Sequence, residues 1–230
     1  VRPTASVVLA DTALAAGETS TVTITFSEAV VGVDLADFSV ENGTLSNLAT
    51  SDSITYTATL TPDADTQDTS NLITLDNSGY LDPAGNTGAA PVSSNNFAID
   101  TLRPTASIVV GDTALAAGET STVTVTFSEA VTGVTTTDFS VENGVINGLT
   151  SSDGGITWTA TLTPTADVED TSNLVTLDNT GVADAAGNAG VGTTDSNSYA
   201  IDTLLPTASI VVADTALAAG ETSSVTITFN

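Results

Sequence analysis

The chain has 230 residues, of which 28 are acidic and two, Arg2 and Arg103, are basic, giving a formal net charge of −26. This charge argues against nucleic-acid binding and against contact with anionic membranes, because almost no side chain could neutralise phosphate groups. The absence of histidine, cysteine and lysine removes most catalytic schemes that use a nucleophile or a general base, and a carboxylate pair would be expected in one site rather than in every repeat, so we do not expect an enzyme. No apolar run approaches the length of about eighteen residues that a membrane-spanning helix needs.

The first elements in chain order are short strands separated by turns. Residues 5–10, ASVVLA, are predicted to form a strand. Residues 12–18, TALAAGE, are predicted to form a turn or a single helical turn, because helix-favouring residues cluster there. Residues 20–26, STVTITF, alternate hydroxyl and apolar side chains, which is typical of a strand with one buried face.

The same pattern continues through the next seventy residues. Residues 37–42, DFSVEN, are predicted to form a strand, and the Asn-Gly pair at 42–43 predicts a hairpin turn because it supplies two residues with positive φ. Residues 54–60, ITYTATL, alternate as the earlier strand does, and further strands are predicted at residues 71–77 and 97–100.

An internal repeat decides the architecture. The segment at residues 2–30 recurs almost unchanged at residues 103–131, and it begins a third time at residues 205–229. A spacing of about one hundred residues is too long for a solenoid repeat and suits whole domains in tandem. Six to seven short strands per repeat, with turns between them, are typical of an antiparallel Greek-key sandwich.

We therefore predict an all-β fold of tandem immunoglobulin-like Greek-key β-sandwiches that form an elongated rod. Residues 1–102 are assigned to the first domain and residues 103–204 to the second. Residues 205–230 are assigned to the first strands of a truncated third domain. Because two strands cannot bury both faces of a sheet unaided, we expect a truncation, a disordered tail or strands that pair with another chain.

Several segments together resemble the bacterial Ig-like repeats of giant surface adhesins, such as biofilm-associated and RTX-type adhesins of type I secretion. These segments are GETSTVTITFSEAV, DFSVENG, YTATLTP and DPAGN, followed by AIDT and PT. The resemblance covers the entire chain. It implies an extended extracellular rod at the bacterial cell surface, stiffened by Ca²⁺ at or near the domain junctions.

A recurring loop supplies candidate ligands for that ion. The sequence LDPAGN at residues 81–86 returns as ADAAGN at residues 183–188. Alternating strand directions place Asp184 and Asn188 of this loop at the same end of the second domain as Glu129 and the linker residue Asp100. Carboxylate and amide oxygens are the ligands that Ca²⁺ prefers, so these four residues predict a calcium site at the first junction. Ordinary turn chemistry of Asp and Asn is the alternative.

The other junctions carry only part of this set. The first domain has Glu28, Asp82 and Asn86 but no preceding linker aspartate, and the third junction has Asp202 but lacks the glutamate. An intact site is therefore not expected at the third junction. The complete set of candidate metal ligands is Glu28, Asp82, Asn86, Asp100, Glu129, Asp184, Asn188 and Asp202.

Two further features of the sequence are not expected to form binding sites. The acidic loop with Asp63, Asp65 and Asp68 is expected to be a solvated surface loop rather than a second cation site. Tyr56 and Trp158, at equivalent positions in one strand, are expected to be core or cross-strand residues rather than a sugar-binding platform.

The predicted function is a structural stalk segment of a large extracellular bacterial adhesin, with Ca²⁺ at the domain junctions. Its partners are neighbouring Ig-like repeats of the same chain, and like chains could associate through residues 205–230. One alternative is a segment of a self-assembling extracellular filament or sheath that uses strand complementation. Another is an Ig-like module that binds a glycan or a protein directly; its long loops repeat closely and hold few aromatic residues, which argues against it.

Overall fold

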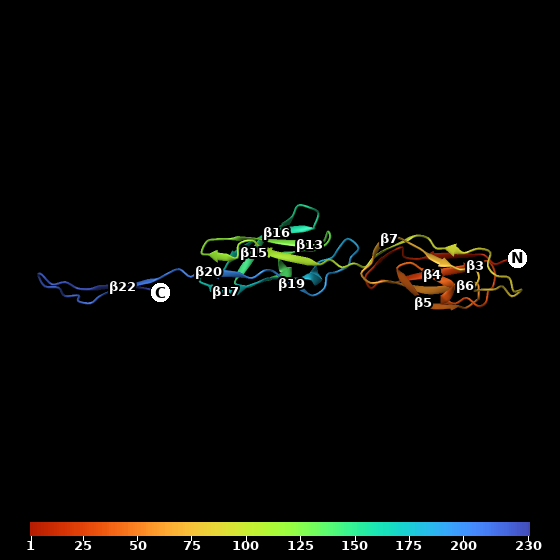
Figure 1. The fold of residues 1–230 in the computed structure, drawn as a ribbon, viewed down its shortest axis with the longest axis horizontal. Helices are drawn as coiled ribbons and strands as arrows, with labels where there is room; N and C mark the ends of the chain where they lie inside the picture. Colours follow the sequence, from red (N-terminus) through yellow and green to blue (C-terminus); the bar gives the residue numbers. More distant parts are fainter. The chain divides into compact units, whose positions relative to one another are not determined.

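A computed structural model describes residues 1–230, and strands dominate it (Figure 1). The first repeat contains β1 (Ala5–Leu9), β2 (Ala13–Ala15), β3 (Ser20–Phe26), η1 (Leu35–Asp37), β4 (Phe38–Val40), β5 (Gly43–Thr50), β6 (Thr55–Pro62), β7 (Gln67–Asn71), β8 (Ile73–Leu75), β9 (Val92–Ser93) and β10 (Phe97–Asp100). The second contains β11 (Ala106–Val110), β12 (Ala114–Ala116), β13 (Ser121–Phe127), η2 (Thr136–Asp138), β14 (Phe139–Val141), β15 (Gly144–Ser151), β16 (Thr157–Pro164), β17 (Glu169–Asn173), β18 (Val175–Asp178), η3 (Asn179–Gly181), β19 (Thr193–Asp195) and β20 (Tyr199–Asp202). The last elements are β21 (Ala208–Val212) and β22 (Val225–Phe229). No helix is long and apolar enough to cross a membrane.

The strands of each repeat form the same three sheets. In the first repeat their orders are β1-β3-β6-β5, β2-β10-β7 and β4-β8-β9. In the second repeat they are β11-β13-β16-β15, β12-β20-β17 and β14-β18-β19. Neighbours such as β2 and β10 are far apart in sequence, so the chain crosses repeatedly between sheets. This arrangement confirms the prediction of an all-β fold in tandem copies.

Contacts divide the chain into two compact units. Unit 1 comprises Val1–Thr105 together with Phe127–Val134 and Asp178–Gly192, and unit 2 comprises the remaining residues. Two loops of the second sequence repeat therefore group with the first. The domain boundaries expected from the sequence stay a prediction.

The alternating strand β3 carries the centre of the first core. Val22 and Ile24 are fully buried and Phe26 is nearly so, whereas the intervening threonines face outward. Tyr56 on β6 joins this core, because its ring meets that of Phe26 edge-on at 5.6 Å between centroids. Trp158, at the equivalent position of β16, is half-buried, and its Nε1 donates to Gly155 O at 3.1 Å. The core interpretation of Tyr56 is confirmed.

The prediction of a turn or helical turn at residues 12–18 is wrong at residues 13–15, although a turn does follow at residues 16–17. Residues Ala13–Ala15 form strand β2, which pairs in parallel with β10. Leu14, only 2% exposed, fills the core from this strand. Tertiary packing thus overrides the helix preference of alanine and leucine.

The predicted hairpin at Asn42 and Gly43 is also wrong. Strand β4 pairs with β8 and strand β5 with β6, so the chain passes here from one sheet to another. Only Asn42 has a positive φ, of 51°. Gly43 serves close packing instead, since a Cβ on it would lie 2.9 Å from Thr61 O. This crossing between sheets has one left-handed residue, whereas the predicted two-residue turn needs two.

The third repeat is a lone two-stranded hairpin. Strands β21 and β22 pair antiparallel in the register of β1 and β3. Their apolar residues are exposed, including Ile210 at 66% and Phe229 at 68%, whereas the equivalent Val7 and Phe26 are buried. Two strands alone leave this apolar face uncovered, as expected.

Truncating Ile24 to alanine is expected to lower the free energy of unfolding of unit 1 by about 2–5 kcal/mol, because the core cannot fully collapse around the lost methyl groups. Thr25→Ala on the outward face of the same strand is the control, with an expected change within about 0.5 kcal/mol. Denaturant unfolding measures both variants. Equal losses of unfolding free energy in the two variants would contradict the assignment of Ile24 to the buried face of β3 and of Thr25 to its exposed face.

Candidate functional site

The loop at residues 184–188 is closed by hydrogen bonds between its first and last residues. The Asn188 backbone N–H donates to Asp184 Oδ1 at 2.8 Å, and the Asn188 side-chain amide donates to Asp184 Oδ2 at 2.7 Å. Gly187 lies between them with φ of +92°, a conformation that a residue with a side chain rarely adopts. The loop therefore does use turn chemistry, and this chemistry fixes the direction of the Asp184 carboxylate.

The same asparagine fastens the loop to the end of the first repeat. Asn188 Oδ1 accepts from the backbone N–H of Ala16 at 2.7 Å, and Asn188 Nδ2 donates to Asp100 O at 2.8 Å. Its side chain is only 2% exposed. Because the Asn188 oxygen already accepts a backbone hydrogen bond, its geometry suits positioning the carboxylates around it. All these residues belong to unit 1.

Three carboxylates meet beside this asparagine. Asp100 at the end of β10, Glu129 in the loop after β13 and Asp184 each offer an oxygen, and these oxygens lie within 4.8 Å of one another. Asp100 Oδ2 accepts from Gln67 Nε2 at 2.9 Å. The structure thus brings three of the predicted ligands together. It is the one group of this kind among residues 1–230.

The electrostatics of this cluster are unfavourable without a partner of positive charge. Asp100 Oδ1 and Glu129 Oε1 are buried and accept no hydrogen bond. Burial, followed by the negative charges of Asp184 and Asp100, raises the pKa of the Glu129 carboxyl. The hydrogen bonds of the chain's two arginines go to backbone oxygens instead, because Arg2 and Arg103 donate to the carbonyl oxygens of Gly88 and Ala189. A bound cation or a proton would reduce the repulsion between the three carboxylates and give the buried oxygens a partner.

The oxygens that could hold a metal are therefore Asp100 Oδ1, Glu129 Oε1 and the Asp184 carboxylate. Ca²⁺ binds six to eight oxygens at about 2.3–2.6 Å, so two oxygens on opposite sides of one ion lie roughly 5 Å apart. The spread of the three carboxylate oxygens, within 4.8 Å, fits such an ion. Backbone carbonyls and water would supply the remaining ligands.

The remaining predicted ligands are not gathered into such a cluster. Asp82 and Asn86 form the same closed loop, with distances of 2.8 and 2.7 Å between Asn86 N and Asp82 Oδ1 and between Asn86 Nδ2 and Asp82 Oδ2. The Asn86 side-chain and backbone hydrogen bonds lower the pKa of Asp82. Glu28, in the loop after β3, is half-buried, and Asp202 is exposed at the end of β20.

The second acidic loop has a structural explanation. Asp68 Oδ1 accepts from Ser70 N at 2.9 Å, and Asp68 Oδ2 accepts from Asn42 Nδ2 at 3.2 Å. Asp63 and Asp65 are exposed. These contacts agree with a solvated surface loop that is pinned by one of its aspartates.

Two contributors to the site were not identified from the sequence. The first is Gln67, whose side-chain amide donates to Asp100. The register of the β7–β10 pair places these two residues opposite each other. Ala16 contributes only its backbone N–H, which no residue type signals. The pairing of β7 with β10 could have been found only by first placing the strands in their sheets.

Replacing Glu129 by glutamine is expected to stabilise the cation-free protein at neutral pH. Folding raises the pKa of Glu129, so the folded state holds the proton more tightly, and stability falls as pH rises from the unfolded value of 4.5 through the folded value. In EDTA, Glu129→Gln should therefore melt higher than the parent at about pH 7.5, with the gap shrinking towards about pH 4.

Glu28→Gln is the matched control, because the equivalent glutamate of the first repeat has no carboxylate cluster. Thermal melts at both pH values in EDTA test the sign. A lower melting temperature for Glu129→Gln at neutral pH would contradict the electrostatic account.

A model of the bacterial Ig-like domain family matches residues 1–99 and again residues 100–201. Among solved structures, the Escherichia coli adhesin FdeC is 16% identical, with 98% of this chain and 72% of that chain covered and a TM-score of 0.37. The Yersinia pseudotuberculosis adhesin InvE is 17% identical, with 84% and 58% covered and a TM-score of 0.32. Murine CEACAM1b is 10% identical, with 86% and 99% covered and a TM-score of 0.31. No curated protein sequence matches. The family match covers both complete repeats, and the chain belongs to the bacterial Ig-like domain family as two tandem copies.

Proposed function

We propose that this chain is a non-enzymatic stalk segment of an extracellular bacterial surface adhesin, and that Asp100, Glu129 and Asp184 bind Ca²⁺. The observation that carries the proposal is the pair of buried, unpartnered oxygens, Asp100 Oδ1 and Glu129 Oε1, next to a third carboxylate. A buried charge without a partner is costly, so the folded chain gains most from a ligand that binds all three.

Membership of the Ig-like family and the close repetition of sequence support the structural part of the role. A stalk requires repeats that fold alike, and it requires no chemistry of its own. The acidic surface keeps an extended extracellular protein soluble. Divalent cations outside the cell would offset part of this charge and couple folding to export.

The cation would act on a short linker. It would fasten the Glu129 loop and the Asp184–Asn188 loop of the second sequence repeat to Asp100, the last residue of β10. Residues 101–104 lie directly after β10, so such a bond would restrict their bending. Loss of the ion would leave the Asn188 hydrogen bonds as the remaining fastening in this part of unit 1.

The filament alternative has one observation in its favour. The hairpin β21–β22 leaves apolar residues exposed that are buried in the complete repeats. A strand from another chain could cover them. For the ligand-binding alternative, Tyr56 is buried and Trp158 is half-buried, so neither offers a fully exposed ring on which a sugar could stack.

The full chain is expected to melt several degrees higher in millimolar Ca²⁺ than in EDTA. At a ligand concentration a hundred times the Kd, linkage contributes about 2.7 kcal/mol, and each kcal/mol shifts the Tm of a chain of this size by about 2–4 °C. Mg²⁺ at the same concentration should have a smaller effect, because it favours shorter bonds and keeps its water.

Asp184→Asn should abolish the calcium-specific shift, whereas Asp82→Asn, in the same closed loop of the first repeat, should retain it. Differential scanning calorimetry on dilute samples measures all three proteins. Equal shifts in Ca²⁺ and Mg²⁺, or a full shift in Asp184→Asn, would remove calcium from the proposal.

Antibodies to the chain should label intact cells of the source bacterium if the surface location is correct.

A further inference from the structure

The side-chain amide of Asn188 is fully engaged by groups of the protein. Its Nδ2 donates to Asp184 Oδ2 at 2.7 Å and to Asp100 O at 2.8 Å, and its Oδ1 accepts from Ala16 N at 2.7 Å. A carboxamide has two hydrogens to donate, so both are used. The asparagine therefore holds other groups in place without needing an ion for any of its own hydrogen bonds.

Two of these bonds continue the backbone ladder of a parallel strand pair. Strands β2 and β10 pair in parallel, and their register ends with Asp100 opposite Ala15. The next bond of this ladder would run from Ala16 N to Asp100 O. The Asn188 carboxamide lies between these two atoms and bonds to both, as an inserted peptide unit would. The loop at residues 184–188 is thus attached to the end of the sheet by neutral groups alone.

A second amide acts on Asp100 from the opposite side of β10. Gln67, which faces Asp100 in the β7–β10 pair, donates from Nε2 to Asp100 Oδ2 at 2.9 Å. The other oxygen, Asp100 Oδ1, is buried and has no hydrogen-bond partner. Gln67 therefore determines which oxygen of Asp100 is left free for the cluster, just as Asn188 fixes the direction of the Asp184 carboxylate.

A third contact fastens the residue that follows the asparagine. Arg103 Nη1 donates to Ala189 O at 2.6 Å, which ties the loop to the segment after β10. Ala185 and Ala186 of the loop line a hollow together with β2 and Asp100, and side chains this small allow a close approach. All these residues belong to unit 1. Removing the Asn188 side chain therefore leaves one fastening of the loop in place.

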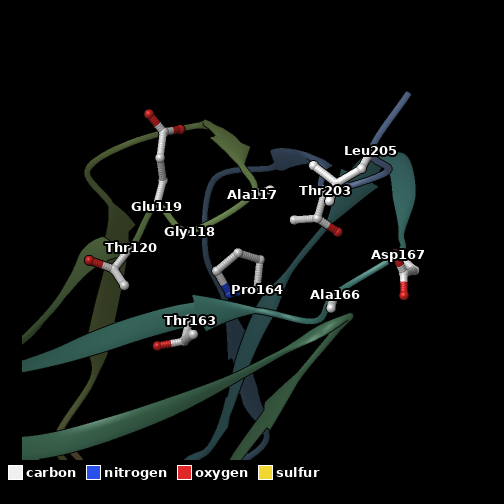
Figure 2. Close-up of a pocket in the computed structure, with 10 residues that line it drawn as sticks. All are labelled: Ala117, Gly118, Glu119, Thr120, Thr163, Pro164, Ala166, Asp167, Thr203 and Leu205. Carbon is white, nitrogen blue, oxygen red and sulfur yellow. The ribbon is translucent and has the colours of Figure 1, made fainter. Parts of the chain in front are cut away.

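Acidic side chains that line a hollow of unit 2 show no such gathering. Two of the residues that line it are acidic, Glu119 and Asp167, and they lie on opposite sides of the hollow (Figure 2). Glu119 Oε2 accepts instead from Ala116 N at 2.9 Å. Because like charges repel, three carboxylates in a chain of net charge −26 need other groups to hold them together.

We propose that Asn188 and Gln67 are positioning residues that assemble the three carboxylates before any cation binds. The inference rests on the proposed function for the identity of the ion, Ca²⁺, whereas the assembly itself is independent of that ion. The cation enters a site that already exists, so little of its binding free energy is spent on ordering the loop. The loop stays fastened to β2 and β10 when Ca²⁺ is removed.

Hydrogen exchange of the Ala16 amide, followed by NMR on the full chain in EDTA, tests the assembly. In the parent this amide should be protected, because it donates to Asn188 Oδ1. Asn188→Ala removes that acceptor and should speed exchange about tenfold or more. Asn86→Ala is the matched control, since it removes the corresponding side-chain bond to Asp82 and no bond to Ala16, so the exchange rate should not change.

Calorimetric titration of the same proteins with Ca²⁺ tests the positioning roles. Asn188→Ala and, independently, Gln67→Leu should each weaken binding about tenfold, because every carboxylate is kept and only its placement is lost. Gln67 is exposed, so Gln67→Leu removes the donor to Asp100 without disturbing the core. Asn86→Ala should bind Ca²⁺ as the parent does.

The outcomes separate this inference from the proposed function. An Ala16 amide that is protected only in Ca²⁺ would overturn the inference, because the ion would then assemble the site, and would leave the proposed function standing. Protection in EDTA that is lost in Asn188→Ala, in a chain that binds no Ca²⁺, would support the assembly and overturn the calcium site. Parental Ca²⁺ affinity in both Asn188→Ala and Gln67→Leu would overturn the positioning roles.

Discussion

Three carboxylate oxygens meet in a partly buried cluster of a chain that has almost no positive charge to set against them. Two of these oxygens have lost water and gained no hydrogen bond, and the pKa of Glu129 is raised as a result. The fold holds them there through hydrogen bonds of neutral groups, chiefly the Asn188 carboxamide. Local turn chemistry and backbone pairing thus maintain an arrangement that electrostatics alone would disperse.

The sheets set this geometry from a distance. Strand β10 ends at Asp100 and is held in place by β2 and β7, which pair with it on either side, while Leu14 anchors β2 in the core. The same strand order recurs in the second repeat, so an equivalent end is built there with Asp202 in place of Asp100. The repeated core therefore provides an equivalent strand end in each repeat. Whether a carboxylate cluster forms at that end depends on the loops that reach it.

The sequence was sufficient for the alternating strands, for the tandem all-β fold and for placing Asp100, Glu129 and Asp184 at one end of a sandwich. The sequence was insufficient where the local structure depends on pairing with a strand that is far away in the chain. Ala13–Ala15 became a strand because β10 offered it a parallel edge, against the helix preference of its residues. Asn42 marks a crossing between sheets, which a local hairpin rule cannot recognise. Asn188 was identified as a candidate ligand. Its hydrogen bond with the backbone N–H of Ala16 could not be predicted, because every residue except proline has such an N–H and the residue type gives no signal.

The most direct measurement is a crystal structure of the chain grown in calcium, with anomalous scattering recorded to identify the ion. The account predicts a calcium peak at about 2.3–2.6 Å from Asp100 Oδ1, Glu129 Oε1 and an Asp184 oxygen. A structure with no ion there, and with a protonated Glu129 donating a hydrogen bond to a neighbouring carboxylate, would contradict the account.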